Sequence, residues 1–335
     1  MDKKMNKGYR IFGIIIVAAI LLTVVYSELA WIGNDENSNP NDEFTFVYQD
    51  RVADAALVVA FEKGFFEDEG LNAKPMRFSS GPACAEALLY GDVQFGTMGD
   101  TTAIIAASKN QPVTIIASHS GGEERHRIIV SDKSGIESIE DLEGKRIGVK
   151  MGTSTHGGLL LFASSNGLDL DDELIDMQPC DQLNALSVGE LDAIVASEPT
   201  PSIGESNGFG REFATLGGYN NTYPILTLVD NEFAAEKPET VRKVLKVLVR
   251  STEYIRENPG EAAMIQANIT GLDVDVVERA MGFHYYAVSM DENTILSLEN
   301  GAEFLMDNGK IASIPDMQEH IDVTYLEDTI SLSDN

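Results

Sequence analysis

Short apolar segments alternate with longer amphipathic segments between residues 44 and 230. Apolar and aromatic residues at alternating positions predict strands, and apolar residues three and four apart predict helices. The first predicted strands are Phe44–Tyr48, Ala73–Phe78 and Val93–Thr97. One helix passes through Ala60 and Phe66, a second follows Pro82, and a third, capped by Asp100, passes through Ala107. This alternation is typical of an α/β fold with a mostly parallel sheet.

The same alternation returns after Arg127 and then gives way to helices. Further strands are predicted at Ile128–Val130, Arg146–Lys150, Leu174–Met177 and Ala193–Val195, and Tyr223–Val229 is predicted to return to the first sheet. From Lys237 onward the spacing of apolar residues predicts helices. We therefore predict two α/β lobes joined by a hinge of two crossings, with residues 44–127 and 222–330 in lobe 1 and residues 128–221 in lobe 2.

Two stretches of the chain, Ala87–Asp100 and Ala185–Glu198, repeat one pattern. Each contains the end of a helix, a glycine turn, a short strand and then a carboxylate. The glycine suits the left-handed conformation found after a helix. The strand then places Asp100 or Glu198 at its carboxyl end, where open α/β sheets bind ligands. Two such units predict one ligand held between two lobes.

The amino terminus combines basic residues with a long apolar segment. The basic residues Lys3, Lys4, Lys7 and Arg10 precede the apolar segment Ile11–Tyr26, and a polar stretch follows. This order directs the rest of the chain out of the cytoplasm. We predict a signal peptide or membrane anchor over residues 1–32, a linker over 33–43 and an extracytoplasmic location. The apolar segment is short for a bilayer span unless Leu29–Ile32 extend it, so an uncleaved anchor and a cleaved signal both remain open.

The composition limits the partners and the chemistry. With 43% apolar and 23% charged residues, the chain is globular. Its net charge of −30 repels phosphates and acidic lipids, so we expect no nucleic acid partner and no membrane contact beyond the N-terminal segment. Cys84 and Cys180 form no CxxC motif, so we expect no metal site, while a disulfide between them remains open. The chain has no HExxH or Walker motif, and we expect neither an enzyme nor a cofactor.

Four motifs carry a resemblance to a known family: Ala60–Leu71, Gly91–Gly96, Ile139–Val149 and Gly189–Ala193. In order and spacing they resemble the solute-binding proteins of ABC importers of the nitrate/sulfonate/taurine class, which also includes binders of thiamine-precursor pyrimidines. The resemblance implies a periplasmic-binding-protein-like fold of type II that closes on a small solute. It also implies an ABC permease with its ATPase as the partner.

The strongest candidate for ligand contact is the segment Gly152, Thr153, Ser154, Thr155 and His156. Small residues at the start of a helix expose backbone N–H groups, and the helix dipole adds partial positive charge, so an anionic or polar group fits there. In the family this position lines the cleft. An ordinary helix cap beside a surface histidine remains the alternative.

Further candidates come from both lobes: Arg51, Ser80, Gly81, Asp100, Thr101, Cys180 and Glu198. Two carboxylates that face one cleft favour a solute with a positive or hydrogen-bond-donating group. Arg51 favours a sulfonate or carboxylate instead, and a zwitterion satisfies both. We therefore expect a small organic anion or zwitterion as the solute.

Other interpretations remain open beside this one. In the first alternative, the solute is a thiamine-precursor pyrimidine. In the second, the protein is a sensor domain without a transporter. An enzyme that uses Cys84 or Cys180 with His156 is a third alternative. The group His119, Arg125, His126 and Arg127 lies near the first crossing, and we expect hinge or surface residues there rather than metal ligands.

Overall fold

The computed structural model describes residues 43–78, 81–170, 172–219 and 221–333. They belong to one compact unit, Glu43–Asn335. The predicted signal or anchor segment, nearly all of the predicted linker and the candidate Ser80 lie outside the described residues. Within those ranges, no helix combines the length and the apolar character that a membrane crossing needs.

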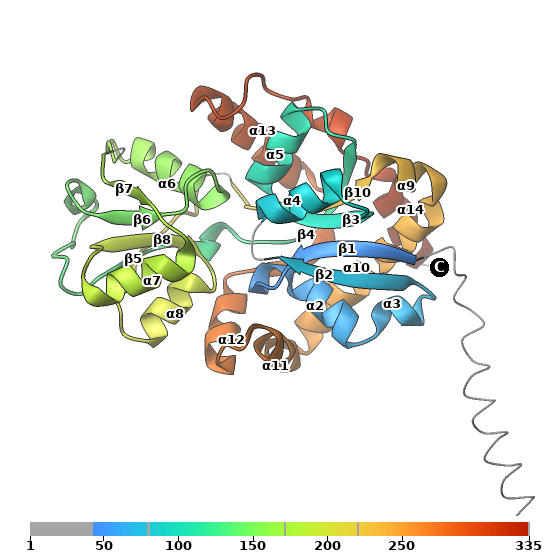
Figure 1. Cartoon of the computed structure of the whole chain (residues 1–335), viewed down its shortest axis with the longest axis horizontal. Coiled ribbons are helices and arrows are strands. Elements are labelled where there is room, and N and C mark those ends of the chain that lie inside the picture. Colours follow the sequence, from blue (N-terminus) through green and yellow to red (C-terminus); the bar gives the residue numbers. More distant parts are fainter. Residues whose placement is uncertain (1–42, 79–80, 171, 220, 334–335) are drawn as a thin grey trace, which may run out of the picture. The chain divides into compact units, whose positions relative to one another are not determined.

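The first sheet has six strands: β1 (Glu43–Gln49), β2 (Asn72–Phe78), β3 (Phe95–Gly99), β4 (Val113–Gly121), β10 (Ile225–Asp230) and β11 (Tyr285–Ser289). Their order across the sheet is β11-β4-β10-β3-β1-β2. In Figure 1, β1 and β2 lie side by side at one edge. β1 is parallel to β2 and β3. β10 is antiparallel to β3 and β4, and β11 is antiparallel to β4.

The second sheet has five strands: β5 (His126–Val130), β6 (Ile147–Val149), β7 (Leu174–Asp176), β8 (Ala193–Ser197) and β9 (Arg211–Thr215). Their order is β7-β6-β8-β5-β9, with β6 parallel to β7 and β8, and β5 antiparallel to β8 and β9. Both sheets are therefore mixed, but four strands of each run in one direction, so the prediction of mostly parallel strands holds apart from β10 and β11 in the first sheet and β5 in the second. β5 and β10 run the other way because they arrive from the other sheet. They enter at the carboxyl-end edge of the parallel strands and must run in the opposite direction.

Ten helices surround the first sheet, some packed on its strands and others, such as α11–α13, packed on those helices. Within the described ranges they are α2 (Ala55–Glu62), α3 (Phe65–Asp68), α4 (Gly81–Tyr90), α5 (Asp100–Ser108), α9 (Asn231–Glu236), α10 (Pro238–Glu257), α11 (Pro259–Thr270), α12 (Val274–Gly282), α13 (Glu292–Asp307) and α14 (Thr324–Ser333). The second sheet packs against α6 (Ser154–Ser165), α7 (Pro179–Val188) and α8 (Thr200–Ser206). Short 3₁₀ helices are η2 (Val52–Asp54), η3 (Glu123–Arg125), η4 (Ile139–Leu142) and η5 (Met317–His320). We call each sheet with its helices the first-sheet body and the second-sheet body.

Two helix boundaries differ from the prediction for local reasons. The single helix predicted through Ala60 and Phe66 is broken into α2 and α3 at Gly64, whose φ of 70° is left-handed and cannot continue a helix. Asp100 was predicted to cap α5 but is the first residue of that helix, and Gly99 occupies the cap position. The Asp100 carboxylate is thereby free to accept hydrogen bonds from beyond its own helix.

Each body has its own hydrophobic core. In the first, aromatic side chains including Phe44, Phe46, Phe66 and Phe95 pack beside the central strands. In the second, a smaller cluster is built around Ile128, Val149 and Val195. Full burial of such side chains contributes about 1.5–3 kcal/mol each, so each body is stabilised by contacts of its own.

The two sheets are joined by two crossings, at residues 122–125 and 216–224. A hydrogen bond joins the two crossings: the N–H of Gly122 donates to the carbonyl of Thr222 at 2.9 Å. The four residues expected at a hinge or a surface, His119, Arg125, His126 and Arg127, are all buried. The surface alternative is therefore wrong for this group. His126 and Arg127 belong to β5, where they pair with β8.

Candidate functional site

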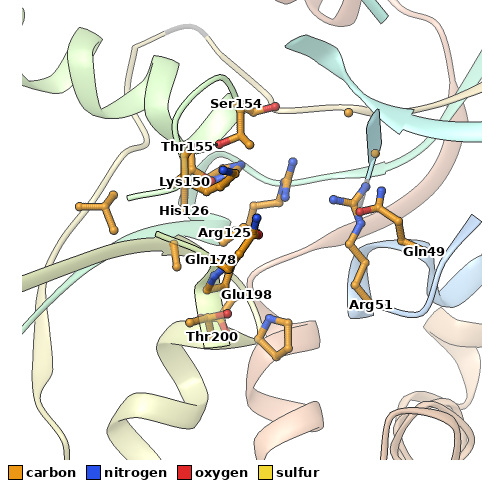
Figure 2. A pocket seen from close by; sticks show the side chains of 18 of the residues that line it. Gln49, Arg51, Arg125, His126, Lys150, Ser154, Thr155, Gln178, Glu198 and Thr200 are labelled. Carbon is orange, nitrogen blue, oxygen red and sulfur yellow. Dashed lines mark hydrogen bonds between the residues drawn. The ribbon is translucent and has the colours of Figure 1, made fainter. Parts of the chain in front are cut away.

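A cavity of about 260 Å³ lies between the two sheets (Figure 2). Three of its lining residues lie just after strands: Arg51 is two residues beyond β1, Lys150 directly follows β6 and Glu198 directly follows β8. The first crossing and the start of β5 contribute Arg125 and His126. The cavity thus lies beyond the carboxyl ends of parallel strands, where open α/β sheets bind ligands.

Arg51 is held at the cavity wall by the buried carboxylate of Asp54. The Nε atom of Arg51 donates to Oδ2 of Asp54 at 2.7 Å, and the Asp54 side chain has no exposed surface. Oδ1 of Asp54 accepts a hydrogen bond from the Thr97 hydroxyl at 2.5 Å and lies 3.7 Å from Nε2 of His119. Burial raises the pKa of Asp54, but Arg51, His119 and Thr97 outweigh it and lower this pKa to about 2. The ionised carboxylate therefore fixes the direction of the Arg51 guanidinium.

Three buried donor nitrogens on residues that line the cavity have no hydrogen-bond partner in the described part of the chain. They are Nη2 of Arg51, Nε2 of Gln49 and Nε2 of His126. Nδ1 of His126 lies 2.8 Å from the Thr155 hydroxyl, and in the tautomer whose Nδ1 accepts that proton, Nε2 is a donor. A buried donor without a partner costs about 1–3 kcal/mol. An anion in the cavity would supply acceptors for such donors.

The electrostatics of the cavity also favour an anion. Arg125 donates from Nε and Nη2 to the Tyr223 carbonyl at 3.2 and 3.1 Å. Burial, followed by the charge of Arg51, lowers the pKa of Arg125 to about 10, so it stays cationic at neutral pH. Burial, reinforced by Arg125, lowers the pKa of His126 well below its ordinary value, so its ring is neutral. Together with Lys150, whose Nζ pairs with Asp176 at 3.0 Å, the cavity thus has three cationic lining side chains in a protein of net charge −30. Arg51 and Lys150 each have one carboxylate partner outside the cavity lining.

The candidate segment at the start of α6 divides between two cavities. Thr153, Ser154 and Thr155 line the cavity between the sheets, and the Thr153 hydroxyl accepts the N–H of His156 as the helix cap. Gly152 and His156 instead line a smaller cavity of about 100 Å³ between α6 and α13. The helix start therefore presents hydroxyl groups to the larger cavity, and the imidazole lies on its other side.

Asp100 and Thr101 are buried and lie outside the larger cavity. They line a space of about 40 Å³ between α5, α6 and α13. The Asp100 carboxylate accepts the N–H of Thr101 at 2.7 Å and also accepts the hydroxyl of Ser154, which starts α6. Since α5 belongs to the first-sheet body and α6 to the second, Asp100 joins the two bodies directly.

Glu198 lines the cavity, but other residues already occupy its carboxylate. Oε1 accepts a hydrogen bond from Nη1 of Arg127 at 2.6 Å, and Oε2 accepts the N–H of Ser202 at 3.3 Å. Burial raises the pKa of Glu198 despite the opposing effect of Arg127. Both oxygens of Glu198 thus already accept hydrogen bonds within the second-sheet body, where Arg127 is shared with Glu205 and Glu212, and this weakens the argument for a cationic group on the solute.

The remaining candidates are Gly81 and Cys180. Gly81 starts α4 and lines the cavity, where a side chain at this position would lie 3.4 Å from the Thr102 hydroxyl. Cys180 is exposed on α7, beside Pro179, which lines the cavity. Cys84 is buried and, like Cys180, is a free thiol, so no disulfide joins them. Burial raises the pKa of Cys84 to about 12.

Sequence reasoning missed several lining residues: Gln49, Arg125, His126, Lys150, Gln178, Gln182 and Thr200. A signal existed for Lys150, which ends a predicted strand in the same way as the predicted candidates. Arg125 and His126 had no such signal, because only the crossing of the chain between the sheets brings them to the cavity. In the described ranges, no group of three or more His, Cys, Asp or Glu side chains is arranged to hold a metal ion.

Comparison with known proteins identifies the family. The model of the family described as NMT1/THI5 like matches residues 53–262, more than half of the chain. The chain belongs to the NMT1/THI5-like family. A protein of Bacillus subtilis (strain 168) named for binding aliphatic sulfonates is 28% identical over 278 residues, which cover 81% of this chain and 83% of that protein. The taurine-binding periplasmic protein of Escherichia coli (strain K12) is 26% identical over 286 residues, which cover 81% of this chain and 88% of that protein.

A solved structure supports the same assignment at the level of the fold. The alkanesulfonate-binding protein SsuA from Xanthomonas axonopodis pv. citri, bound to MOPS, has a TM-score of 0.76 at 22% identity, and the match covers 84% of this chain and 99% of that chain. The α/β fold with two mixed sheets is therefore that of periplasmic-binding-protein-like structures. These findings confirm the family predicted from the four motifs.

The relatives of this chain also include an enzyme. The 4-amino-5-hydroxymethyl-2-methylpyrimidine phosphate synthase of Aspergillus parasiticus is 23% identical over 224 residues, which cover 62% of this chain and 64% of that protein. Family membership alone thus leaves the choice between binding and catalysis to the residues of the cavity.

Proposed function

We propose that this protein is the extracytoplasmic solute-binding component of an ABC importer and that its solute is a small organic anion of the sulfonate class. The observation that carries this proposal is the cavity, whose wall has three cationic side chains and three unpaired buried donors in a strongly acidic protein. The names of the Bacillus and Escherichia relatives point to the same class of solute.

The binding mechanism follows from the contacts of the cavity. Sulfonate oxygens would accept hydrogen bonds from Nη2 of Arg51, Nε2 of Gln49 and Nε2 of His126. The hydroxyl groups at the start of α6 and the dipole of that helix would add further stabilisation. Because Arg51 belongs to the first-sheet body and His126 to the second, one anion would contact both. Such a solute shifts the equilibrium of the protein toward the arrangement in which the two bodies are close together.

The proposed partners and location extend the same function. We take residues 44–127 with 222–330 as lobe 1, residues 128–221 as lobe 2, and the two crossings as their hinge in a type II fold. Residues 1–32 would hold the protein at the outer face of the membrane, or direct its export, beside a permease with its ATPase.

Among the described lining residues of the cavity there is no cysteine, which favours binding over cysteine-based catalysis.

A thermal-shift assay of the full-length protein in detergent tests this function. Ethanesulfonate and taurine are compared with ethanesulfonamide, a neutral analogue of similar size. A solute at 100 times its dissociation constant stabilises the folded state by about 2.7 kcal/mol, and we expect this for a sulfonate but not for the sulfonamide. Equal shifts for the charged and neutral compounds would contradict an anion site.

The second candidate solute is an aminopyrimidine, which the Aspergillus relative brings into consideration. A shift with an aminopyrimidine and none with sulfonates, nitrate or bicarbonate would favour it. Taurine and ethanesulfonate differ by one ammonium group, so their ratio of affinities measures whether the cavity recognises a zwitterion. Because Arg127 occupies the Glu198 carboxylate, we expect little preference for taurine.

A further inference from the structure

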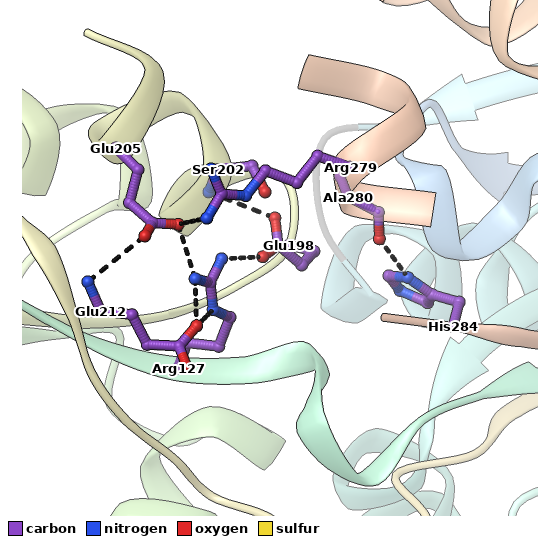
Figure 3. A network of polar contacts seen from close by, with 8 residues as sticks. All are labelled: Arg127, Glu198, Ser202, Glu205, Glu212, Arg279, Ala280 and His284. Carbon is purple, nitrogen blue, oxygen red and sulfur yellow. Dashed lines mark hydrogen bonds and ion pairs between the residues drawn. The ribbon is translucent and has the colours of Figure 1, made fainter. Parts of the chain in front are cut away.

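A cluster of charged residues lies between the two bodies on the side of the cavity formed by α8 and α12 (Figure 3). Its members are Arg127, Glu198, Glu205, Glu212 and Arg279. Arg127 is fully buried in β5 and is the centre of the cluster. All the others except Arg279 belong to the second-sheet body.

Arg127 uses each of its guanidinium nitrogens within the second-sheet body. Nη1 donates to Glu198, Nε donates to Glu212 at 2.7 Å, and Nη2 donates to Oε2 of Glu205 at 2.5 Å. Oε1 of Glu205 accepts the N–H of Glu212 at 3.3 Å. These bonds fix Glu205 at the surface of α8 that faces α12.

Two contacts connect this cluster to the first-sheet body. Nη2 of Arg279, on α12, lies 2.8 Å from Oε2 of Glu205. The ring of Phe283, which follows α12, has its centroid 4.3 Å from Cζ of Arg127. A guanidinium over an aromatic face is attracted to the ring. The same Arg127 that balances Glu198 at the cavity therefore also contacts the opposite body.

We propose that the Arg279–Glu205 ion pair and the Arg127–Phe283 contact form a clamp that holds the two bodies together and thereby sets solute affinity from outside the cavity. The affinity part of this inference rests on the proposed function, whereas the clamp itself does not. One contact needs α8 to lie beside α12 and the other needs β5 to lie beside the end of α12, so together they stabilise the arrangement in which the bodies are close. The apparent dissociation constant of a solute rises as the fraction of protein in that arrangement falls.

The clamp can be tested by a substitution of Arg279 that disturbs little of the surrounding structure. The Arg279 side chain is 48% exposed, so its removal leaves no buried cavity, and Glu205 keeps its bonds to Arg127. Arg250 is a matched control, because its Nη2 pairs with Asp68 at 2.9 Å and its Cζ lies 3.9 Å from the Phe65 ring. All three of these residues belong to the first-sheet body, and the Arg250 side chain is 44% exposed.

Distances between spin labels on the full-length protein test the clamp without any solute. Cys180 on α7 is exposed and takes one label, whereas Cys84 is buried. Tyr90→Cys, at the exposed end of α4 in the first-sheet body, provides the second position. We expect Arg279→Ala to shift the distance distribution of the ligand-free protein toward longer distances. Arg279→Lys should largely restore it, and Arg250→Ala should leave it unchanged. An unchanged distribution in Arg279→Ala would overturn the clamp.

Binding kinetics with ethanesulfonate test the link to affinity. Ion pairs of this exposure contribute modestly, so we expect Arg279→Ala to raise the dissociation constant about two- to fivefold. The rise should come from faster dissociation, because the clamp exists only after the bodies approach. Slower association with unchanged dissociation would mean that Arg279 only attracts the anion, and this would overturn the role in affinity. If the unsubstituted protein binds no sulfonate, the proposed function fails, while the spin-label distances still decide the clamp.

Discussion

The two bodies each place an arginine and a carboxylate beside the cavity, but in opposite orientations. In the first-sheet body Arg51 lines the cavity and the buried Asp54 holds it from behind. In the second, Glu198 lines the cavity and the buried Arg127 holds it from behind. Arg51 keeps a donor without a partner, whereas Glu198 accepts two hydrogen bonds and Arg127 is satisfied by three carboxylates.

The difference teaches that the position of a charged residue at a cavity does not by itself show which ligand it attracts. The ligand preference depends on whether the hydrogen-bonding atoms of the charged group already have partners within the protein. Among the described residues, the first pair leaves one guanidinium donor of Arg51 without a partner, whereas each oxygen of the Glu198 carboxylate already accepts a hydrogen bond. We therefore expect the cavity, although it is lined by residues of both signs, to favour an anion over a cation.

Removal of Glu198 should have the largest effect of the substitutions considered, and the effect should be on stability. Glu198→Ala leaves the buried Arg127 without one of its partners, and the loss of one member of a buried pair costs about 3 kcal/mol. Urea unfolding of this variant and of Glu190→Ala, an exposed glutamate nearby, measures the difference. A loss below about 1 kcal/mol would show that Glu205 and Glu212 satisfy Arg127 by themselves.

Removal of Arg51 should weaken binding, and because it takes the ion-pair partner away from the buried Asp54, it should also lower stability. Arg51→Gln keeps a polar side chain but removes the unpaired cationic donor, and we expect a loss of about 2 kcal/mol, or about thirtyfold in affinity for ethanesulfonate. Calorimetric titration checks this value. Arg77→Gln, an exposed arginine on β2 of the same sheet, removes the same charge and should change the affinity little. Similar losses in both variants would mean that general charge, and not the Arg51 donor, attracts the anion.

The pH dependence of stability should have opposite signs for the two carboxylates. The pKa of Asp54 is lowered to about 2 from 3.8, so its contribution is present above about pH 4 and is lost as the pH falls toward 2. This shift corresponds to about 2 kcal/mol. The pKa of Glu198 is raised above 4.5, so its contribution is present below that pH and is lost as the pH rises through the folded-state pKa. The free energy of unfolding is measured as a function of pH for Asp54→Asn, Glu198→Gln and the unsubstituted protein. The difference between each variant and the unsubstituted protein gives the pH-dependent contribution of that carboxylate. Curves of the same sign would contradict the comparison.

The smallest effect is expected at Asp100, which repeats the sequence position of Glu198 in the other body. Asp100→Asn weakens the bond to Ser154 between the bodies, and we expect a loss of about 1 kcal/mol in solute binding, or about fivefold. Ser154→Ala removes the other partner of the same bond. The double variant should therefore lose less than the sum of the two single losses. Additive losses would indicate that Asp100 and Ser154 act separately.

Much of the fold was predictable because its signals are local. The alternation of apolar residues located β1 and β2 closely, and the order of units implied that one α/β unit is inserted into the other. The position of β3 was predicted two residues early, because Val93 is apolar and buried although it precedes the strand. The antiparallel direction of β5 and β10 was missed, since no local pattern reports from which edge a strand enters a sheet.

The candidate site was predicted less completely. Arg51, Gly81, Glu198 and the hydroxyl residues Thr153–Thr155 line the cavity, and each lies next to a predicted strand end or helix start. Gly152, His156, Asp100 and Thr101 lie in the same segments but on other sides of their helices. The sequence predicted which segments lie at the cavity. Which residues of a segment face the cavity depends on how its helix is rotated about its axis.

The sequence by itself determined two α/β units, the loops after their strands as the candidate binding region, and the family. These properties depend on periodicity, glycine turns and motifs, which are formed by residues close together in the sequence. Only the tertiary structure decided that Arg127 lies behind Glu198, that the crossing brings Arg125 and His126 to the cavity, and that Arg279 reaches Glu205. These pairings join residues far apart in the chain. The charge that a solute meets depends on them, because a buried ionic group is available for binding only where the fold leaves it unsatisfied.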